Sequence, residues 1–341
     1  MSGKLIVSSP PFLRNGETTH CLMFDALIAC APIFFFSVYF FGVDAFIIMT
    51  LSVLTAKITE LVIQVLFKAK NFDFNNPIFS VMESQEITVM DGSAAVTGLL
   101  LALTLPPSVP WWMPVVGSAF AIAVGKHVFG GLGYNIFNPA LVGRAFLLAA
   151  WPTHMTTWER PVNWFAAEGG AVVDAVTTAT PLGMMKMDGQ TTPLLDLLVG
   201  NIGGCIGETS AIAILLGAAY LLHKGTIKWH IPFFYLGTVL IFALVTGHNP
   251  VFHLLSGGLL LGAFFMATDV VTSPVTIYGR VIFGICVGLI TMVIRCYGGY
   301  PEGVCYAILI MNGFVPLIDR YTRKNVAKGE IDIPLVNKIL N

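Results

Sequence analysis

A pattern of hydroxyl-bearing and acidic residues lies in the middle of the longest polar segment of the chain, residues 152–201. It fits the spacing D-x-x-[ST]-x-A-T and reads Asp174-Ala175-Val176-Thr177-Thr178-Ala179-Thr180. A threonine hydroxyl is a weak nucleophile that reacts only when a base and a well-placed electrophile are supplied. Pro181 follows Thr180 directly and disfavours the helical conformation there. We therefore expect the Thr180 hydroxyl to lie on extended chain, where an external enzyme can reach it.

This spacing is the one that periplasmic flavin transferases recognise when they join the phosphate of FMN to a threonine hydroxyl through a phosphoester. It predicts covalent FMN on Thr180 and a flavin transferase as a partner. Cofactor-binding roles are expected for the other four positions of the pattern: Asp174, Thr177, Thr178 and Ala179. The chemistry needs an exposed hydroxyl, so a threonine buried in a helix would not serve. The alternative is an ordinary threonine-rich loop.

The elements that must position this pattern are apolar. Of the 341 residues, 56% are hydrophobic and 11% are charged, so lipid must cover much of the surface. The net charge of −1 gives no indication of a nucleic-acid partner. Apolar runs predict an all-α polytopic membrane protein with about ten transmembrane helices, at residues 22–42, 45–67, 88–106, 112–129, 136–151, 202–222, 231–247, 251–268, 280–296 and 303–318.

Lysine and arginine placement orients these helices, because cytoplasmic loops are enriched in both. With both termini in the cytoplasm, most of these residues fall inside, and the segment 152–201 lies outside with only Arg160 and Lys186. We expect a protein of the bacterial cytoplasmic (inner) membrane with five parts. They are a cytoplasmic leader (1–21), a first transmembrane repeat (22–151), an external loop with the attachment pattern (152–201), a second repeat (202–318) and a cytoplasmic tail (319–341).

Two faint correspondences predict that the repeats are inverted. The run that begins at Gly98 resembles the run that begins at Gly258, and Phe129-Gly130-Gly131 resembles Tyr297-Gly298-Gly299. Five helices separate the copies, which would give them opposite orientations. Inverted repeats with helices broken by glycine often hold a site near the membrane midplane. The alternative is that small residues only allow close helix packing.

Other polar residues lie within or beside the apolar runs. Asn135 and Asn138 lie at the mouth of the fifth span, in the glycine- and asparagine-rich segment 130–144, which suits a flavin-contacting or ion-pathway loop, or a turn that only caps a broken helix. Asp269 follows the eighth span and is a second candidate, against the alternative of a solvated helix end. Lys57 and Glu60 share a helix face, which predicts a mutual ion pair.

Two kinds of chemistry are not indicated. The six cysteines form no C-x-x-C pair and the histidines show no metal-ligand spacing, so we expect no metal site in this chain. There is no G-x-x-x-x-G-K-[ST], so ATP hydrolysis is not supported. We also expect no catalytic side chain, since a bound flavin would supply the chemistry.

The chain resembles the RnfD subunit of Rnf ferredoxin:NAD oxidoreductase complexes and the related NqrB subunit of the sodium-pumping NADH:quinone oxidoreductase, Nqr. The likeness rests on the threonine pattern and on Ser8-Ser9-Pro10-Pro11, Asp91-Gly92-Ser93-Ala94, Gly133-Tyr134-Asn135-Ile136-Phe137-Asn138-Pro139-Ala140 and Ala267-Thr268-Asp269-Val270-Val271-Thr272-Ser273-Pro274. Its length favours the Rnf subunit. The family pattern usually has glycine where this chain has Thr178.

The resemblance implies a membrane electron-transfer subunit with covalent FMN, in a complex that couples electron transfer between ferredoxin and NAD to sodium or proton translocation. Its partners would be the other subunits of that ion-translocating oxidoreductase and membrane lipid. The related Nqr subunit implies a second, non-covalent flavin (riboflavin) near Asn135 and Asn138. The alternatives are the Nqr subunit itself and a channel or secondary transporter without redox function, which would have no use for the threonine pattern.

Overall fold

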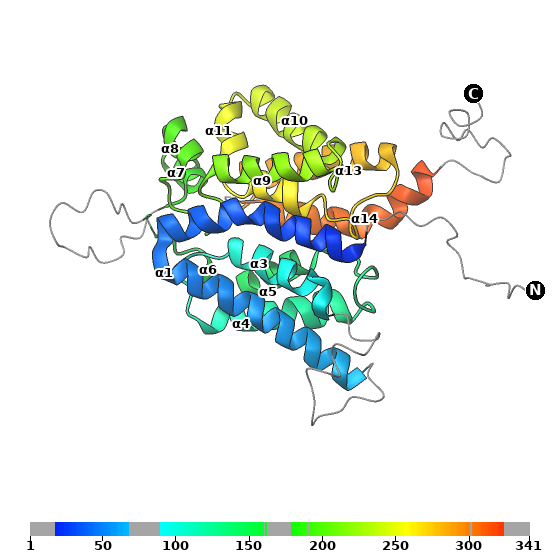
Figure 1. Ribbon diagram of the computed structural model, residues 1–341. Coiled ribbons are helices and arrows are strands. Elements are labelled where there is room, and N and C mark those ends of the chain that lie inside the picture. The colour runs from blue at the N-terminus through cyan, green and yellow to red at the C-terminus, as the bar shows by residue number, and fades with distance from the viewer. Residues whose placement is uncertain are drawn as a thin grey trace, which may run out of the picture.

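A computed structural model describes residues 18–67, 89–159, 161, 179–189, 191–300 and 302–323, and its regular elements are helices (Figure 1). The predicted all-α fold is confirmed. The first apolar segment is α1 (Thr19–Phe67), which leaves helical geometry at Gly42, where φ is 68° and ψ is −142°. Glycine adopts this backbone without the Cβ clash that other residues would meet. The predicted separation of spans 22–42 and 45–67 is therefore confirmed.

Short helices follow α1 in the first half of the chain. They are η1 (Val89–Asp91), α3 (Ser93–Leu103), α4 (Trp112–Phe120), which continues as the π-helical η2 (Ala121–His127), α5 (Pro139–Ala150) and α6 (Pro152–Met155). The start of α5 follows from its sequence, since Asn138 caps its first turn and Pro139 occupies the first helical position. The predicted break before the fifth span is thus confirmed.

The second half contains both short and long helices. They are α7 (Pro181–Asp188), α8 (Leu194–Val199), α9 (Ala211–Lys224), α10 (His230–Val245), α11 (Pro250–Leu255), α12 (Leu259–Leu261), the π-helical η3 (Gly262–Met266), α13 (Ile277–Tyr297) and α14 (Val304–Thr322). Each of the ten predicted apolar spans overlaps a described helix, and the first two overlap the two halves of α1.

Two predicted spans have the wrong boundaries. The span 202–222 is helical only from Ala211, because residues 206 and 207 instead donate backbone hydrogen bonds to Leu105 and Leu103. Gly207 allows this approach, since a Cβ there would lie 2.6 Å from the Cβ of Leu103. The span 251–268 is broken into α11, α12 and η3, and the break falls at residues 256–258.

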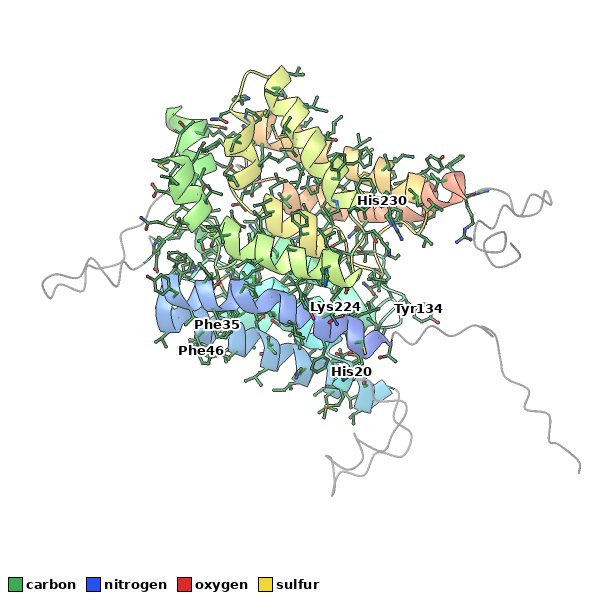
Figure 2. All side chains as sticks on the ribbon, turned by 45° about the horizontal axis from the view of Figure 1, so that its top comes forward. His20, Phe35, Phe46, Tyr134, Lys224 and His230 are labelled. Atoms are coloured by element: carbon green, nitrogen blue, oxygen red, sulfur yellow. The ribbon has the colours of Figure 1, made fainter. Side chains whose placement is uncertain are left out.

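Short elements form the centre of the bundle. Almost all of α3 is buried, as are all residues of α12 and η3, and α5 buries half of its residues. Apolar side chains line the outside. Phe35 is 68% exposed and, with Phe46, lies on the outer surface of α1 (Figure 2). Among the described residues, α1, α13 and α14 are long and apolar enough to cross a membrane, and four shorter apolar helices have 10–17 residues.

Different helices lie at the two ends of the bundle. The beginning of α1 and the end of α14 lie at one end, whereas α7 and α8 lie at the other (Figure 1). This arrangement separates Thr180, which directly precedes α7, from the described residues nearest to both termini. The leader 1–21 and the tail 319–341 lie mostly outside the described residues.

Candidate functional site

Thr180 is the N-cap of α7. Its backbone is extended, with φ −63° and ψ 156°, as expected from the proline that follows. Its hydroxyl oxygen accepts a hydrogen bond from the backbone N–H of Gly183 at 3.1 Å. The expectation of an exposed hydroxyl is wrong for this structure, because Thr180 is only 4% exposed. Pro181 starts a helix that folds Thr180 onto the rest of the protein.

Thr180 faces a cavity of about 260 Å³, which we call the threonine pocket. Four aromatic or cationic side chains line it: Trp158, Tyr300, Tyr306 and Arg144. Apolar groups cover most of the remaining wall, contributed by Leu141, Leu148, Met155, Ala179, Met187, Leu261 and Val304. The pocket therefore has flat aromatic surfaces, an apolar wall and one concentrated region of charge.

The charged region is a buried ion-pair cluster around Arg144 of α5. One guanidinium nitrogen donates to Glu302 at 2.7 Å, and the other lies 3.5 Å from Glu208 and donates to the carbonyl oxygen of Thr104 at 2.7 Å. The thiol of Cys205 is 3.4 Å from the same nitrogen. A buried arginine with two carboxylates is stable only when its donors are used, as they are here. The cluster joins α5 to the loops before α9 and α14.

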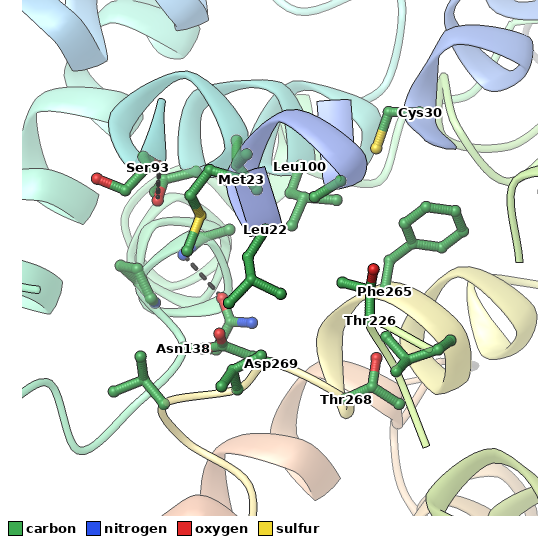
Figure 3. Close-up of a pocket in the computed structure, with 18 of the residues that line it drawn as sticks. Leu22, Met23, Cys30, Ser93, Leu100, Asn138, Thr226, Phe265, Thr268 and Asp269 are labelled. Atoms are coloured by element: carbon green, nitrogen blue, oxygen red, sulfur yellow. Dashed lines mark hydrogen bonds between the residues drawn. The ribbon is translucent and has the colours of Figure 1, made fainter. Parts of the chain in front are cut away.

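A second cavity of about 100 Å³, which we call the asparagine pocket, lies between the beginning of α1, α3, α5 and η3. Three of the predicted site residues line it: Asn135, Asn138 and Asp269. Figure 3 shows Asn138 and Asp269 there with Ser93 and Thr268. Apolar contributions come from Leu22, Met23, Leu100 and Phe265. The structure thus brings together residues from segments 130–144 and 267–274.

The polar residues of the asparagine pocket differ in how well they are satisfied. The Asn138 side chain accepts from the backbone N–H groups of residues 140 and 141 and donates to the carbonyl oxygen of Met266 at 3.2 Å. Asn138 therefore caps α5 and ties it to η3. Asp269 accepts from Thr272 at 3.0 Å. Within the described residues, the buried Oδ1 of Asn135 has no hydrogen-bond partner, so this oxygen is available to a ligand.

The predicted pair of Lys57 and Glu60 is wrong. Lys57 is exposed, whereas Glu60 is buried and pairs with Lys126 of η2, the two charged atoms being 2.6 Å apart. Lys126 also donates to Ser93 at 2.6 Å, and His127 lies 3.6 Å from Glu60. Sharing a helix face did not bring Lys57 into contact, because that residue lies on the outer side of the helix.

The two pockets lie at opposite ends of the same short helices. Residue 138 at the start of α5 lines the asparagine pocket, and residue 144 lines the threonine pocket. Similarly, α12 contributes to the threonine pocket, and η3, which continues it, contributes to the asparagine pocket. Both pockets are therefore built on the same two central segments of the bundle.

Only part of the predicted attachment pattern can be placed. Ala179 and Thr180 line the threonine pocket, while Asp174, Thr177 and Thr178 lie outside the described residues. The positions of Glu208 and Glu302 in the charged cluster were not recognised from sequence. The only signal was that each is an isolated acidic residue next to an apolar run.

Two largely apolar pockets with a few buried polar groups lie between short buried helices and are surrounded by long apolar helices, which defines a multi-pass α-helical membrane protein with internal cavities. The chain belongs to the NQR2, RnfD, RnfE family, whose family model matches residues 6–328. This result confirms the resemblance noted from the sequence motifs.

Curated relatives match along nearly the whole chain. It is 48% identical to the D subunit of the Na⁺-translocating ferredoxin:NAD⁺ oxidoreductase complex of Acetobacterium woodii, over 94% of this chain and 95% of that protein. It is 43% identical to the D subunit of the proton-translocating ferredoxin:NAD⁺ oxidoreductase complex of Clostridium ljungdahlii, over 93% and 94%. It is 36% identical to the D subunit of the ion-translocating oxidoreductase complex of Yersinia enterocolitica, over 94% and 97%.

Proposed function

We propose that this chain is the membrane subunit of an ion-translocating ferredoxin:NAD⁺ oxidoreductase complex and carries FMN on Thr180. The function of the complex is supported by the relatives, whose names describe such complexes and whose similarity spans nearly the whole chain. The observation that supports the cofactor is the position of Thr180. Its hydroxyl lies at the wall of an aromatic-lined, partly charged cavity and not on an unstructured surface.

The residues around Thr180 fit a phosphoester-linked flavin. The hydroxyl lies at the N-terminus of α7, where backbone N–H groups and the helix dipole favour an anionic phosphate. Gly183 leaves space there, since a Cβ on this residue would lie 3.2 Å from the hydroxyl oxygen. Trp158, Tyr300 and Tyr306 offer flat faces to a ring system.

When bound, FMN would accept and release electrons, and the protein would supply position and electrostatics. Arg144 holds a positive charge in the threonine pocket and is itself fixed by Glu302 and Glu208. The largely apolar wall lowers the effective dielectric around this cluster, which strengthens its electrostatic influence. These residues would position the cofactor and tune its electrostatic surroundings.

The asparagine pocket is our proposed site for a second, non-covalent flavin such as riboflavin. Its walls are largely apolar, and Asn135 offers a buried oxygen without a partner among the described residues. Lys126 and Asp269 also reach this cavity. The pocket lies toward the end of the bundle that contains the start of α1, so a flavin there would be separate from one on Thr180.

We further propose two inverted repeats, with both termini in the cytoplasm and α7 on the outer face of the bacterial inner membrane. The opposite placement of α7 and of the described chain ends supports this orientation. The two π-helical segments η2 and η3, one in each half, are consistent with a repeat. The transported ion stays open, since relatives at 48% and 43% identity are named for sodium and for protons.

Covalent attachment is tested by producing the chain with a flavin transferase and measuring its intact mass after denaturation. The native chain should carry the FMN mass and give a fluorescent band in a denaturing gel. Thr180→Val keeps the side-chain shape, removes the nucleophile and should abolish both signals. Thr178→Val is the matched control and should retain them. FMN mass on the Thr180→Val protein would contradict the assignment, and a native chain without flavin would favour a channel or secondary transporter without redox function.

A further inference from the structure

The position of Thr180 raises a problem of access. Its hydroxyl oxygen accepts the N–H of Gly183 and belongs to a residue that is 4% exposed at an internal cavity. A transferase must bring a flavin nucleotide and a base to that oxygen together, within hydrogen-bonding distance. In the docked position of α7, burial of Thr180 and the hydrogen bond from Gly183 hinder such an approach to the hydroxyl oxygen.

Among the described residues, a charged contact and an apolar contact hold α7 in this position. Lys186, on the last turn of α7, donates to the carbonyl oxygens of Arg295 at 3.3 Å and Tyr300 at 3.4 Å, and also to that of Gly298. These carbonyls belong to the C-terminal end of α13 and the residues that follow it. A positive charge is favourable there, because it satisfies carbonyl groups left without helical partners and opposes the helix dipole.

The second holding contact is apolar. Leu182 is buried in a small cluster with Leu197, Ile202 and Phe252, and this cluster is separate from the main core of the protein. A segment held by a small apolar cluster and one exposed charged contact has a lower free energy of local opening than the main core. The segment 179–189 is therefore suited to move as a unit while the bundle stays folded.

We propose that residues 179–189 form a clasp that opens to receive the flavin and then closes to carry it into the threonine pocket. The proposal rests on the proposed attachment at Thr180. In the open state the hydroxyl oxygen attacks the phosphorus of a flavin dinucleotide. A P–O bond forms to Thr180, the pyrophosphate bond breaks, a nucleoside monophosphate leaves, and the hydroxyl proton passes to a base of the transferase. Lys186 and Leu182 set how often the clasp opens.

The clasp predicts a quantitative effect of Lys186. When opening and closing are fast compared with the transfer, the initial rate follows the population of the open state. Loss of a helix C-terminal charge contact raises that population about two- to fivefold. Lys186→Met should therefore speed attachment by that factor. The same substitution should leave the attached flavin more accessible, because the clasp then closes less completely.

The experiment uses the full chain, produced without transferase, purified in detergent and mixed with flavin dinucleotide and transferase. Intact mass against time gives the initial rate, and iodide quenching of flavin fluorescence gives accessibility. Lys186→Met and Leu182→Ala should both raise the rate and the quenching constant. Lys186→Arg can still donate to the same carbonyls and should behave as the native chain. Lys228→Met is the matched control, because Lys228 is exposed in the loop between α9 and α10.

The outcomes separate the two proposals. If the native chain takes up no flavin, attachment at Thr180 is wrong and the clasp falls with it. If every variant takes up flavin at the native rate, attachment stands and the clasp is refuted. A slower Lys186→Met protein that is still monodisperse on size exclusion would also refute it, since the transferase would then need the docked form.

Discussion

The buried pair between Lys126 and Glu60 allows a sharp test of the internal electrostatics. Lys126 is 2% exposed and Glu60 is 1% exposed, and their charged atoms are 2.6 Å apart. Lys126→Met keeps the length of the stem and removes the charge. Among the described residues, Glu60 would then keep the amide of Gln64 at 3.1 Å and His127 at 3.6 Å. Breaking a buried pair in this way costs about 3–5 kcal/mol, because it leaves an uncompensated charge.

The expected consequence is a large fall in thermal stability. At about 2 °C per kcal/mol for a long chain, Lys126→Met should lower the apparent Tm by about 6–10 °C. Adding Glu60→Gln removes the stranded charge and should recover most of the loss, since both charges are then absent. Lys57→Met, at the exposed lysine three residues before Glu60, should change stability by less than about 0.5 kcal/mol. Unfolding followed by tryptophan fluorescence in detergent measures all four proteins. Equal effects of Lys126→Met and Lys57→Met, or no recovery in the double variant, would refute the pairing.

Two further predictions concern the asparagine pocket and the topology. Asn138→Ala should cost about 0.5–2 kcal/mol of stability, because the cap of α5 is lost. It should also lower coupled activity while covalent FMN remains. An unchanged activity with native stability would show that Asn138 has no role in the pocket. A cysteine introduced at Gly189 should react with an impermeant thiol reagent on intact spheroplasts, and one introduced at Lys228 should not. Both are compared with a cysteine-free background. The reverse pattern would remove the case for attachment on the outer face.

Local signals were enough to place most helices. Apolar runs identified the long segments, Gly42 separates the halves of α1, and the Asn138–Pro139 pair starts α5. The errors occurred where tertiary contacts override hydropathy. The stretch before Ala211 is apolar enough to continue the helix, but its backbone instead bonds to the chain after α3. A backbone partner that is distant in sequence decides whether such a segment is helical, and a single sequence does not reveal that partner.

Charge pairing was the least predictable feature of the candidate sites. Spacing along one helix reports which side chains share a face, but not whether that face meets lipid or another helix. Glu60 and Lys126 are 66 positions apart, and Arg144 and Glu302 are 158 apart, so neither pair leaves a local pattern. The proposed attachment at Thr180 could be predicted because an enzyme must recognise a short linear segment, which a sequence records directly. Its burial, in contrast, depends on where α7 docks.

The short helix α5 connects the electrostatics of both pockets. Asn138 lines one pocket and Arg144 the other, and six residues of helix separate them by about 9 Å. Two unit charges about 10 Å apart in surroundings with an effective dielectric of about 20 interact by roughly 1.7 kcal/mol. A unit charge gained in the threonine pocket would therefore change the binding equilibrium of a singly charged ligand in the asparagine pocket by more than tenfold, without any movement of the chain. A movement of α5 would add to this effect, because the hydrogen bond from Asn138 to Met266 and the ion pair from Arg144 to Glu302 tie the start and the middle of this helix to the second half of the protein.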